Sequence, residues 1–181
     1  MKEKILDAAE KRVRSAGFAE MSFRDIAGDV GIKSASVHYH FPTKTDLGEA
    51  LVNRYAIRFR ARLDRIDRSS LDTALDEFTA LYAEALVLNE SICLCAIMGA
   101  EAIGLPESVN QRIKVFFDTN TDWLVDLFAN HNIPNAKDSA ALIVAALEGG
   151  MIVASASGDR SVFDRVTRAA LHSIRGAGQP A

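Results

Sequence analysis

The stretch SFRDIAGDVGIKSASVHYHFPTKTDL, residues 22–47, predicts two short helices, a tight turn between them and the start of a third helix. Ser22 stands three residues before Asp25, and at this spacing the hydroxyl accepts from a first-turn N–H while the carboxylate reaches back to the helix start. Gly31 follows the apolar face of the first helix, and a residue without Cβ takes the positive φ of a sharp turn at little cost. This pattern is typical of a helix-turn-helix.

The second short helix has small residues at its start and hydrogen-bonding residues further along. Ser34 is expected to cap it, and Pro42 blocks its continuation. Thr43 and Asp46 then repeat the capping pattern and begin the third helix. Such a helix suits the major groove of DNA, and the two capped N-termini beside it favour phosphate. The residues expected to contact DNA are Ser22, Arg24, Lys33, Ser34, Ala35, Ser36, His38, Tyr39, His40, Thr43 and Lys44.

This stretch resembles the DNA-binding signature of the TetR-type (TetR/AcrR) transcriptional regulators. The residues in register with that signature are Ser22, Arg24, Ile26, Ala27, Gly31, His40, Phe41, Lys44 and Leu47. His38 stands where the family usually has a tyrosine that contacts a backbone phosphate, although a histidine can also donate to phosphate. The resemblance covers residues 1–60 and extends beyond them only through helical architecture. It implies a homodimer that binds double-stranded DNA at a roughly palindromic operator and responds to an unknown small-molecule inducer.

Beyond this stretch, apolar residues keep recurring at intervals of three and four, and no strand pattern is present. We therefore expect an all-α fold of about nine helices, including one long helix from 43 to 67. Ser69 with Asp72, and Asn135 with Asp138, have the spacing of capping boxes and predict the starts of two later helices.

Charge is divided unevenly along the chain, whose net charge is −3. Residues 1–68 carry 14 Lys and Arg against 10 Asp and Glu, a net charge of +4, whereas residues 69–181 carry 7 against 14, a net charge of −7. The difference fits a basic DNA reader and an acidic body. We expect a three-helix DNA-binding domain over 1–48, which the long helix joins to a helical ligand-binding and dimerisation domain over 49–181.

Residues 139–156 carry a single charge, Glu148, so they predict a helix that is apolar on all sides and must be covered on several. A membrane span is the alternative, but the run is short, contains Ala, Ser and Gly, and has a carboxylate near its middle. The body has too few helices to surround it, so one face should pack against a second copy of the chain. The residues expected at this dimer interface are Gly149, Gly150, Ile152, Val153, Phe163, Val166, Ala170 and Ile174.

Polar groups beside apolar helix faces are typical of a ligand pocket, although a satisfied core or interface position is as common. The residues expected to line such a pocket are Cys93, Met98, Glu101, Phe117, Asn120, Trp123 and Glu148. For Glu148, ligand contact, an interface position and a buried hydrogen bond all remain open.

The sequence indicates no metal site, cofactor or catalytic motif. His38 and His40 are two residues apart on a helix, so their rings point about 200° apart and cannot share one ion. The same geometry separates Cys93 from Cys95, and two cysteines are too few for a disulfide framework. The N-terminus has no apolar signal region, so we expect a cytoplasmic protein.

By resemblance, and in agreement with the residue patterns, the sequence predicts a DNA-binding transcriptional regulator. We expect a homodimeric repressor that a small-molecule inducer releases from its operator. Two alternatives keep the DNA-binding head but change the body, which would be either a protein-interaction module or a thiol-based sensor of oxidants or electrophiles.

Overall fold

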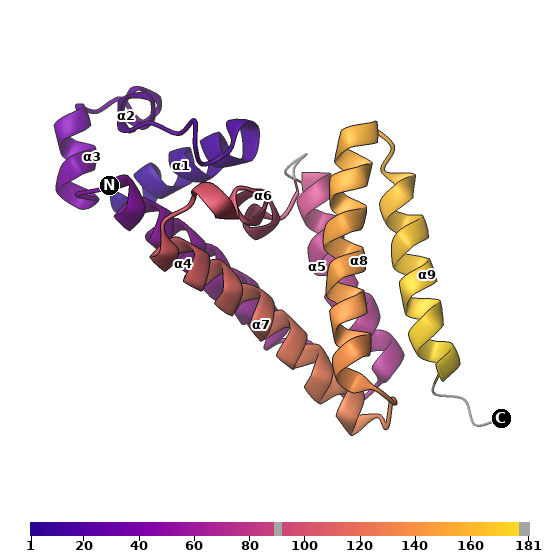
Figure 1. Cartoon of the computed structure of the whole chain (residues 1–181). Coiled ribbons are helices and arrows are strands. Elements are labelled where there is room, and N and C mark those ends of the chain that lie inside the picture. Colours follow the sequence, from indigo (N-terminus) through magenta and orange to yellow (C-terminus); the bar gives the residue numbers. More distant parts are fainter. Residues whose placement is uncertain (89–91, 178–181) are drawn as a thin grey trace. The chain divides into compact units, whose positions relative to one another are not determined.

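The computed structural model describes residues 1–88 and 92–177, and all regular elements within these ranges are helical. The all-α prediction of about nine helices is confirmed (Figure 1). In chain order the elements are α1 (Lys2–Ala16), α2 (Phe23–Val30), α3 (Ser34–His40), α4 (Lys44–Leu63), α5 (Leu71–Leu88), α6 (Leu94–Ala100), the 3-10 turn η1 (Ala102–Gly104), α7 (Glu107–Asn130), α8 (Ala136–Ser157) and α9 (Ser161–Ala177). By their internal contacts these elements form two compact units, which are described separately.

The first unit comprises residues 1–58 and 94–115, and so contains α1, α2, α3, α6 and the N-terminal parts of α4 and α7. In this unit α1 packs against both α2 and α6. The face that α1 buries follows the expected helical spacing, because each of its members recurs three or four residues after another. Its buried residues are Ile5, Leu6, Ala9 and Val13.

Two arginines of α4, Arg54 and Arg58, form ion pairs with carboxylates of α1, and Arg54 makes the shorter contacts. The Arg54 guanidinium donates to the carboxylates of Glu3, Asp7 and Glu10 at 3.2, 2.7 and 2.9 Å. Its side chain is only 10% exposed, so these charge-assisted bonds are better shielded from solvent than ordinary surface pairs. These ion pairs therefore hold α1 against the middle of α4.

The two capping boxes around the turn are confirmed. The Ser22 hydroxyl accepts from the Asp25 N–H at 3.2 Å and donates to its carboxylate at 2.6 Å. Thr43 accepts from the Asp46 N–H at 3.1 Å, and the Asp46 carboxylate accepts from the Thr43 N–H at 2.9 Å. Ser34 does not cap α3 as expected, because it is already the first helical residue.

Two other predicted boundaries are displaced, one by a single residue and one by four. Ser70, not Ser69, caps α5, since its hydroxyl accepts from the Thr73 N–H at 3.3 Å. The predicted start of α8 is correct, because Asn135 is its N-cap, but the Asn135 side chain makes no capping hydrogen bond. The long helix α4 ends at Leu63, four residues before its expected end, because the next residues form tighter turns.

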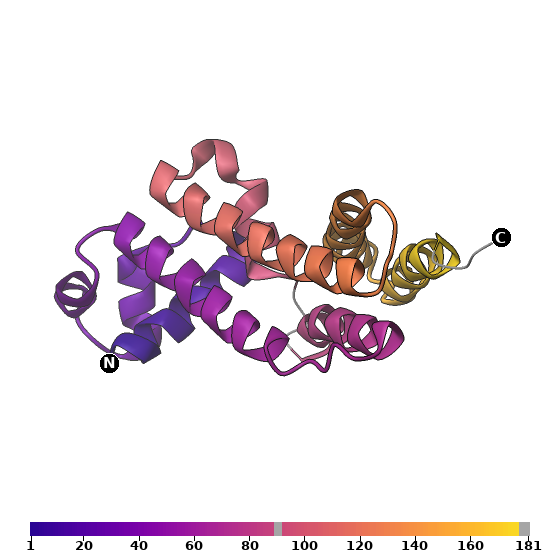
Figure 2. The same ribbon diagram turned by 90° about the horizontal axis from the view of Figure 1, so that it is seen from below.

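The second unit comprises residues 59–93 and 116–181, and α5, α8 and α9 lie wholly within it. Figures 1 and 2 show α8 and α9 side by side, joined by a short turn so that they run in opposite directions. Gly150 permits their close approach, since a Cβ there would lie 3.3 Å from a Val166 methyl group. Both helices also pack against α5.

The compact units do not follow a single cut in the sequence. The segment 94–115 packs with the N-terminal helices, although it lies within the 49–181 domain expected from the sequence. A packing unit and a functional domain can have different limits, so the functional division at residue 48 stays a prediction.

Candidate functional site

The turn between α2 and α3 has the geometry that a helix-turn-helix requires. Gly31 adopts φ 73° and ψ 37°, the left-handed conformation that glycine takes without a Cβ clash. The next N–H, that of Ile32, donates to the Ala27 carbonyl at 2.9 Å and closes the end of α2. Ile26 on α2 and Val37 on α3 are fully buried, so the two helices pack through their inward faces.

The outward face of α3 carries the side chains that were predicted to contact DNA. Tyr39 is 83% exposed. Lys33, Ala35 and His38 are also exposed, as are Arg24 on α2 and Thr43 before α4, whereas Ser22, Ser34, Ser36, His40 and Lys44 are half-buried. All of these residues belong to the first unit, which therefore contains both the hydrogen-bonding groups and the cations that were predicted to contact DNA.

His38 is held at the base of this face by two neighbours. Its ring meets the Phe23 ring edge-on, with centroids 4.6 Å apart. Its Nδ1 lies 3.4 Å from the Pro42 carbonyl oxygen. The ring is therefore oriented by α2 and by the end of α3, while the side chain remains exposed to a partner.

Lys44 and Glu101 both bind the loop between α1 and α2. The Lys44 ammonium donates to the Ala19 carbonyl at 2.7 Å and lies 5.0 Å from the centre of the Phe18 ring. The Glu101 carboxylate accepts from the backbone N–H groups of Phe18 and Ala19, each at 2.8 Å. Lys44 was predicted to contact DNA and Glu101 to line a ligand pocket; the contacts that the structure gives them are within the protein.

Two family models match most of the chain. Residues 5–51 match that of the bacterial regulatory proteins of the tetR family. Residues 68–169 match that of the C-terminal domain of LmrA/YxaF-like transcriptional regulators. The chain belongs to the TetR family.

Solved structures of other TetR-family proteins resemble it over nearly the whole length. A TetR transcriptional regulator from Legionella pneumophila is 29% identical, with a TM-score of 0.88 over 96% of this chain and 97% of that one. A regulator from Agrobacterium tumefaciens is 28% identical, with a TM-score of 0.88 over 96% of each chain. The nucleoid occlusion factor SlmA of Marinobacter nauticus is 26% identical over 119 residues, which is 65% of this chain and 60% of that protein. The chain therefore spans less than two thirds of the length of this relative.

As a TetR-family protein, the chain is a DNA-binding transcription regulator and not an enzyme. The match to the tetR-family model over residues 5–51 includes α2, the turn at Gly31 and α3.

The residues predicted to line a ligand pocket are divided between the two units of the TetR-family fold. Met98 and Glu101 belong to the first unit, and Cys93, Phe117, Asn120, Trp123 and Glu148 belong to the second. In the second unit Asn120 is buried and donates to the Tyr82 hydroxyl at 3.3 Å. Trp123 stacks on Phe78 with ring centroids 5.3 Å apart. Asn120 and Trp123 thus join an aromatic cluster within the body.

Glu148 differs from the other buried polar residues, because neither of its carboxyl oxygens has a hydrogen-bond partner among the described residues. It is 8% exposed. Burial, and then the nearby Cys93 side chain, raise the pKa of Glu148 to about 10, so the carboxyl is neutral at pH 7. Cys93 and Cys95 are themselves buried, at 1% and 0% exposure. A buried thiol beside a carboxyl lacks the access and the positive surroundings of a reactive cysteine.

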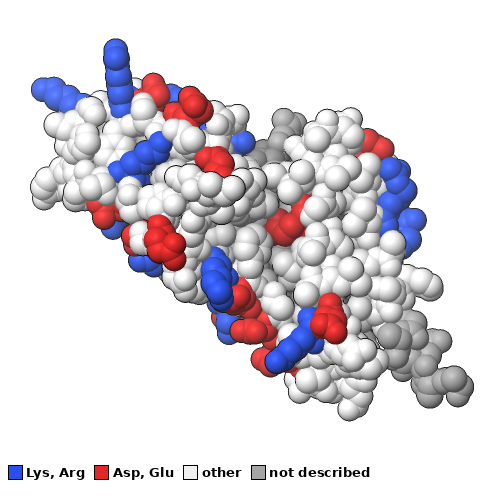
Figure 3. Space-filling model, in the orientation of Figure 1, with Lys and Arg blue, Asp and Glu red and all other residues white. Residues whose placement is uncertain are grey.

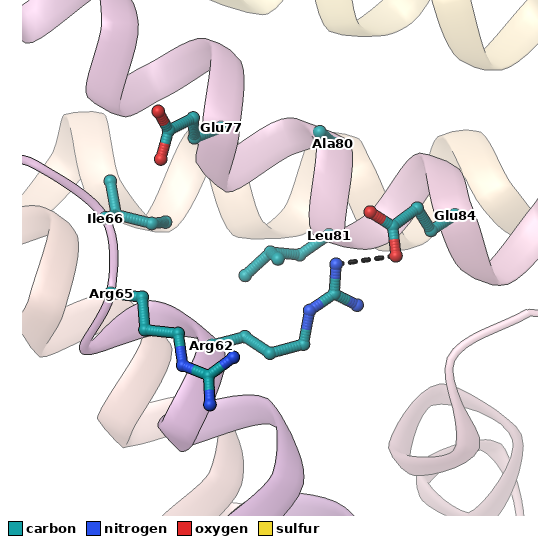
Figure 4. Close-up of a pocket in the computed structure, with 7 residues that line it drawn as sticks. All are labelled: Arg62, Arg65, Ile66, Glu77, Ala80, Leu81 and Glu84. Atoms are coloured by element: carbon teal, nitrogen blue, oxygen red, sulfur yellow. Dashed lines mark hydrogen bonds and ion pairs between the residues drawn. The ribbon is translucent and has the colours of Figure 1, made fainter.

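A pocket of about 250 Å³ opens elsewhere on the second unit, between the end of α4 and α5. Figure 4 shows Arg62 paired with Glu84 across it, at 2.6 Å, while Arg65 and Glu77 lie on either side of Ile66. A second pocket, of about 370 Å³, lies on the first unit and is lined by residues of α4 and α7, including Glu49 and Arg112. Neither pocket contains a residue that the sequence predicted to contact a ligand.

The predicted dimer residues fall into two groups. Phe163, Ala170 and Ile174 are buried by packing within the chain, and Gly150 and Val166 approach each other between α8 and α9. Ile152 and Val153 are exposed at 44% and 52%, and Leu142 on the same helix at 50%. A Cβ on Gly149 would meet nothing within 4 Å. The surface over α8 is largely uncharged in Figure 3. The exposed side chains of Leu142, Ile152 and Val153, with Gly149, form an apolar stripe on this helix.

Among the described residues, α8 is the one helix long and apolar enough to cross a membrane by length and composition. The core helix of a soluble protein passes the same test, and α8 packs against α5 and α9 while containing a glutamate. Its buried and exposed faces fit a helix that is covered on one side by its own chain.

Proposed function

We propose that this TetR-family regulator is a homodimeric, cytoplasmic repressor that a small-molecule inducer releases from a roughly palindromic operator. The observation that carries the proposal is the apolar stripe on α8, formed by Leu142, Gly149, Ile152 and Val153. A second copy with the same stripe would cover it through a two-fold axis, because such an interface is self-complementary. The dimer would then carry two DNA-binding domains, one for each half-site of the operator.

The dimer gives the inducer a way to act. Half-sites lie about 34–36 Å apart on successive turns of DNA, so both heads bind only when their separation matches this spacing. An inducer that binds the body better when the heads are mismatched shifts the population away from DNA. The unpaired Glu148 carboxyl favours an inducer with a hydrogen-bond donor or a cationic group, since such a group would satisfy it. A thermal-shift screen of small molecules tests this step.

The exposed residues of the head should divide into sequence readers and phosphate contacts. We expect Tyr39→Ala to reduce the preference for an operator selected from random duplexes about tenfold, because Tyr39 is 83% exposed on α3 and can reach base edges. Lys33→Ala should weaken binding to the operator and to an unrelated duplex equally. It should also reduce the slope of log affinity against log salt concentration by about one, because one phosphate contact is lost. Fluorescence anisotropy at several salt concentrations measures both. An equal loss of preference in the two variants would contradict these roles.

The SlmA relative favours a second candidate, in which the body binds another protein instead of an inducer. That relative is named as a nucleoid occlusion factor, and the shared region is 26% identical. A protein of this kind would bind DNA as a dimer, and no small molecule would weaken its DNA binding. Release from the operator by a compound found in the thermal-shift screen would favour the repressor.

The thiol-sensor alternative has less support from the surroundings of the two cysteines. Cys93 and Cys95 are both buried, and Glu148 beside Cys93 does not stabilise a thiolate. We expect a double cysteine-to-serine variant to respond to oxidants and alkylating agents as the natural protein does.

A further inference from the structure

The loop between α1 and α2 is held from two sides by charged side chains. From one side the Glu101 carboxylate accepts the N–H groups of Phe18 and Ala19, one on each oxygen, at 2.8 Å. From the other side Lys44 donates to the Ala19 carbonyl at 2.7 Å. The Ala19 residue is thus bonded at both its N–H and its C=O, and charge-assisted bonds of this kind are stronger than neutral ones.

Gly17 makes room for this arrangement. Its φ is +86°, a region that side chains disfavour, and a Cβ there would lie 2.4 Å from a carboxylate oxygen of Glu101. The glycine at the end of α1 therefore permits both the direction of the loop and the approach of the carboxylate. A Cβ on Gly48 of α4 would likewise lie 2.8 Å from the Phe18 ring. The loop is closely fitted on both sides.

The two charged partners come from different parts of the sequence. Lys44 is the first residue of α4 and follows the reading helix α3 by a few residues. Glu101 directly follows α6, within the region that matches the C-terminal domain of the family. The loop itself leads to Ser22, which caps α2. A change in the position of α6 would thus reach the start of α2 through this carboxylate, in addition to the direct packing of α6 against α1.

We infer that Glu101 is a positioning residue for DNA binding, which couples α6 of the C-terminal domain to the placement of the reading helices. Glu101 does not touch DNA itself; it acts through the loop residues Phe18 and Ala19. The inference requires only that the chain binds DNA, and it is independent of the dimer and of the inducer.

Hydrogen–deuterium exchange on the full chain tests this coupling, with an operator duplex selected from random sequences as the probe. In the natural protein, DNA bound to α3 should slow exchange in peptides from 94–105 as well as in those from 22–40. Glu101→Gln keeps the shape of the side chain but turns an amide NH₂ toward one of the two N–H groups. We expect it to lower operator affinity about tenfold, and to abolish the DNA-induced slowing in 94–105 while keeping it in 22–40 at saturating DNA.

The matched control is Glu107→Gln, which changes an exposed glutamate of the same unit. It should leave both readouts as in the natural protein. A variant that merely destabilises the fold would speed exchange with and without DNA, so the DNA-dependent difference separates positioning from stability. Unchanged exchange in 94–105 when the natural protein binds DNA would overturn the inference, as would Glu101→Gln with normal affinity and normal slowing.

Discussion

Glu148→Gln should raise the free energy of unfolding by about 2 kcal/mol at pH 7 and should flatten its dependence on pH. The natural carboxyl is buried, lacks a hydrogen-bond partner among the described residues and has a pKa raised to about 10, first by burial. A group held neutral in the folded state but ionised in the unfolded state opposes folding. Replacing it with a residue that cannot ionise removes that opposition.

The sign of the pH effect follows from proton uptake. The pKa of the Glu148 carboxyl is about 10 in the folded protein, whereas its ordinary pKa, which applies when unfolding exposes it, is 4.5. Between these values the folded state holds more protons, so the free energy of unfolding falls as pH rises. Between pH 4.5 and pH 7 the carboxyl lowers the free energy of unfolding by about 3 kcal/mol, at about 1.36 kcal/mol per pH unit. Replacing the carboxyl removes this effect, but the buried amide of glutamine lacks a partner, which reduces the expected stabilisation by about 1 kcal/mol.

Urea unfolding at pH 5, 7 and 9, at one protein concentration, measures this prediction. Glu77→Gln is the control, because Glu77 is exposed on α5 in the same unit. The difference between Glu148→Gln and the natural protein should grow steadily with pH, while the control shows none. An equal difference at all three pH values would contradict the neutral buried carboxyl. The same variant should respond less to an inducer if Glu148 contacts it.

The reading head could be predicted in detail because its signals are local. Ser22 and Thr43 have their capping partners three residues away. Gly31 predicts the turn because it has no Cβ and can adopt the left-handed conformation found there. Such bonds depend on spacing along the chain, so the sequence contains all the necessary information. Weaker local patterns failed where a neighbour competed, as when Ser70 capped α5 in place of Ser69.

The long-range contacts could not be predicted from spacing. Glu101 was expected near a ligand, and spacing gave no sign that its carboxylate accepts from residues that lie 82 and 83 positions earlier. Arg54 likewise has its three carboxylate partners on α1, at least 44 positions away. A polar residue on an apolar helix face indicates a buried partner without identifying it. Only the packing of α1, α4 and α6 in one unit supplies that identity.

Val153→Asp should convert the protein to monomers at micromolar concentration and lower its operator affinity at least a hundredfold. Val153 is 52% exposed at the C-terminal end of the α8 stripe, so the substitution should leave the single chain folded. A two-fold axis would place two such carboxylates in one apolar interface, where burial and mutual repulsion both disfavour association. In a monomer, binding of one DNA-binding domain no longer raises the effective concentration of a second one at the other half-site. Such linkage increases affinity by about 10²–10⁴.

Sedimentation measures the association of this variant, and anisotropy measures its binding to the operator. Ile103→Asp is the matched control, because Ile103 is an exposed apolar residue outside α8 and should leave the protein dimeric. Gly149→Leu supplies a neutral test of the same interface. Its side chain would meet open space in the single chain but would fill the position of the facing helix. If both α8 variants remain dimeric, or if the natural protein binds its operator as a monomer, the stripe has some role other than dimerisation, because a buried interface could accept neither the added charge nor the added volume.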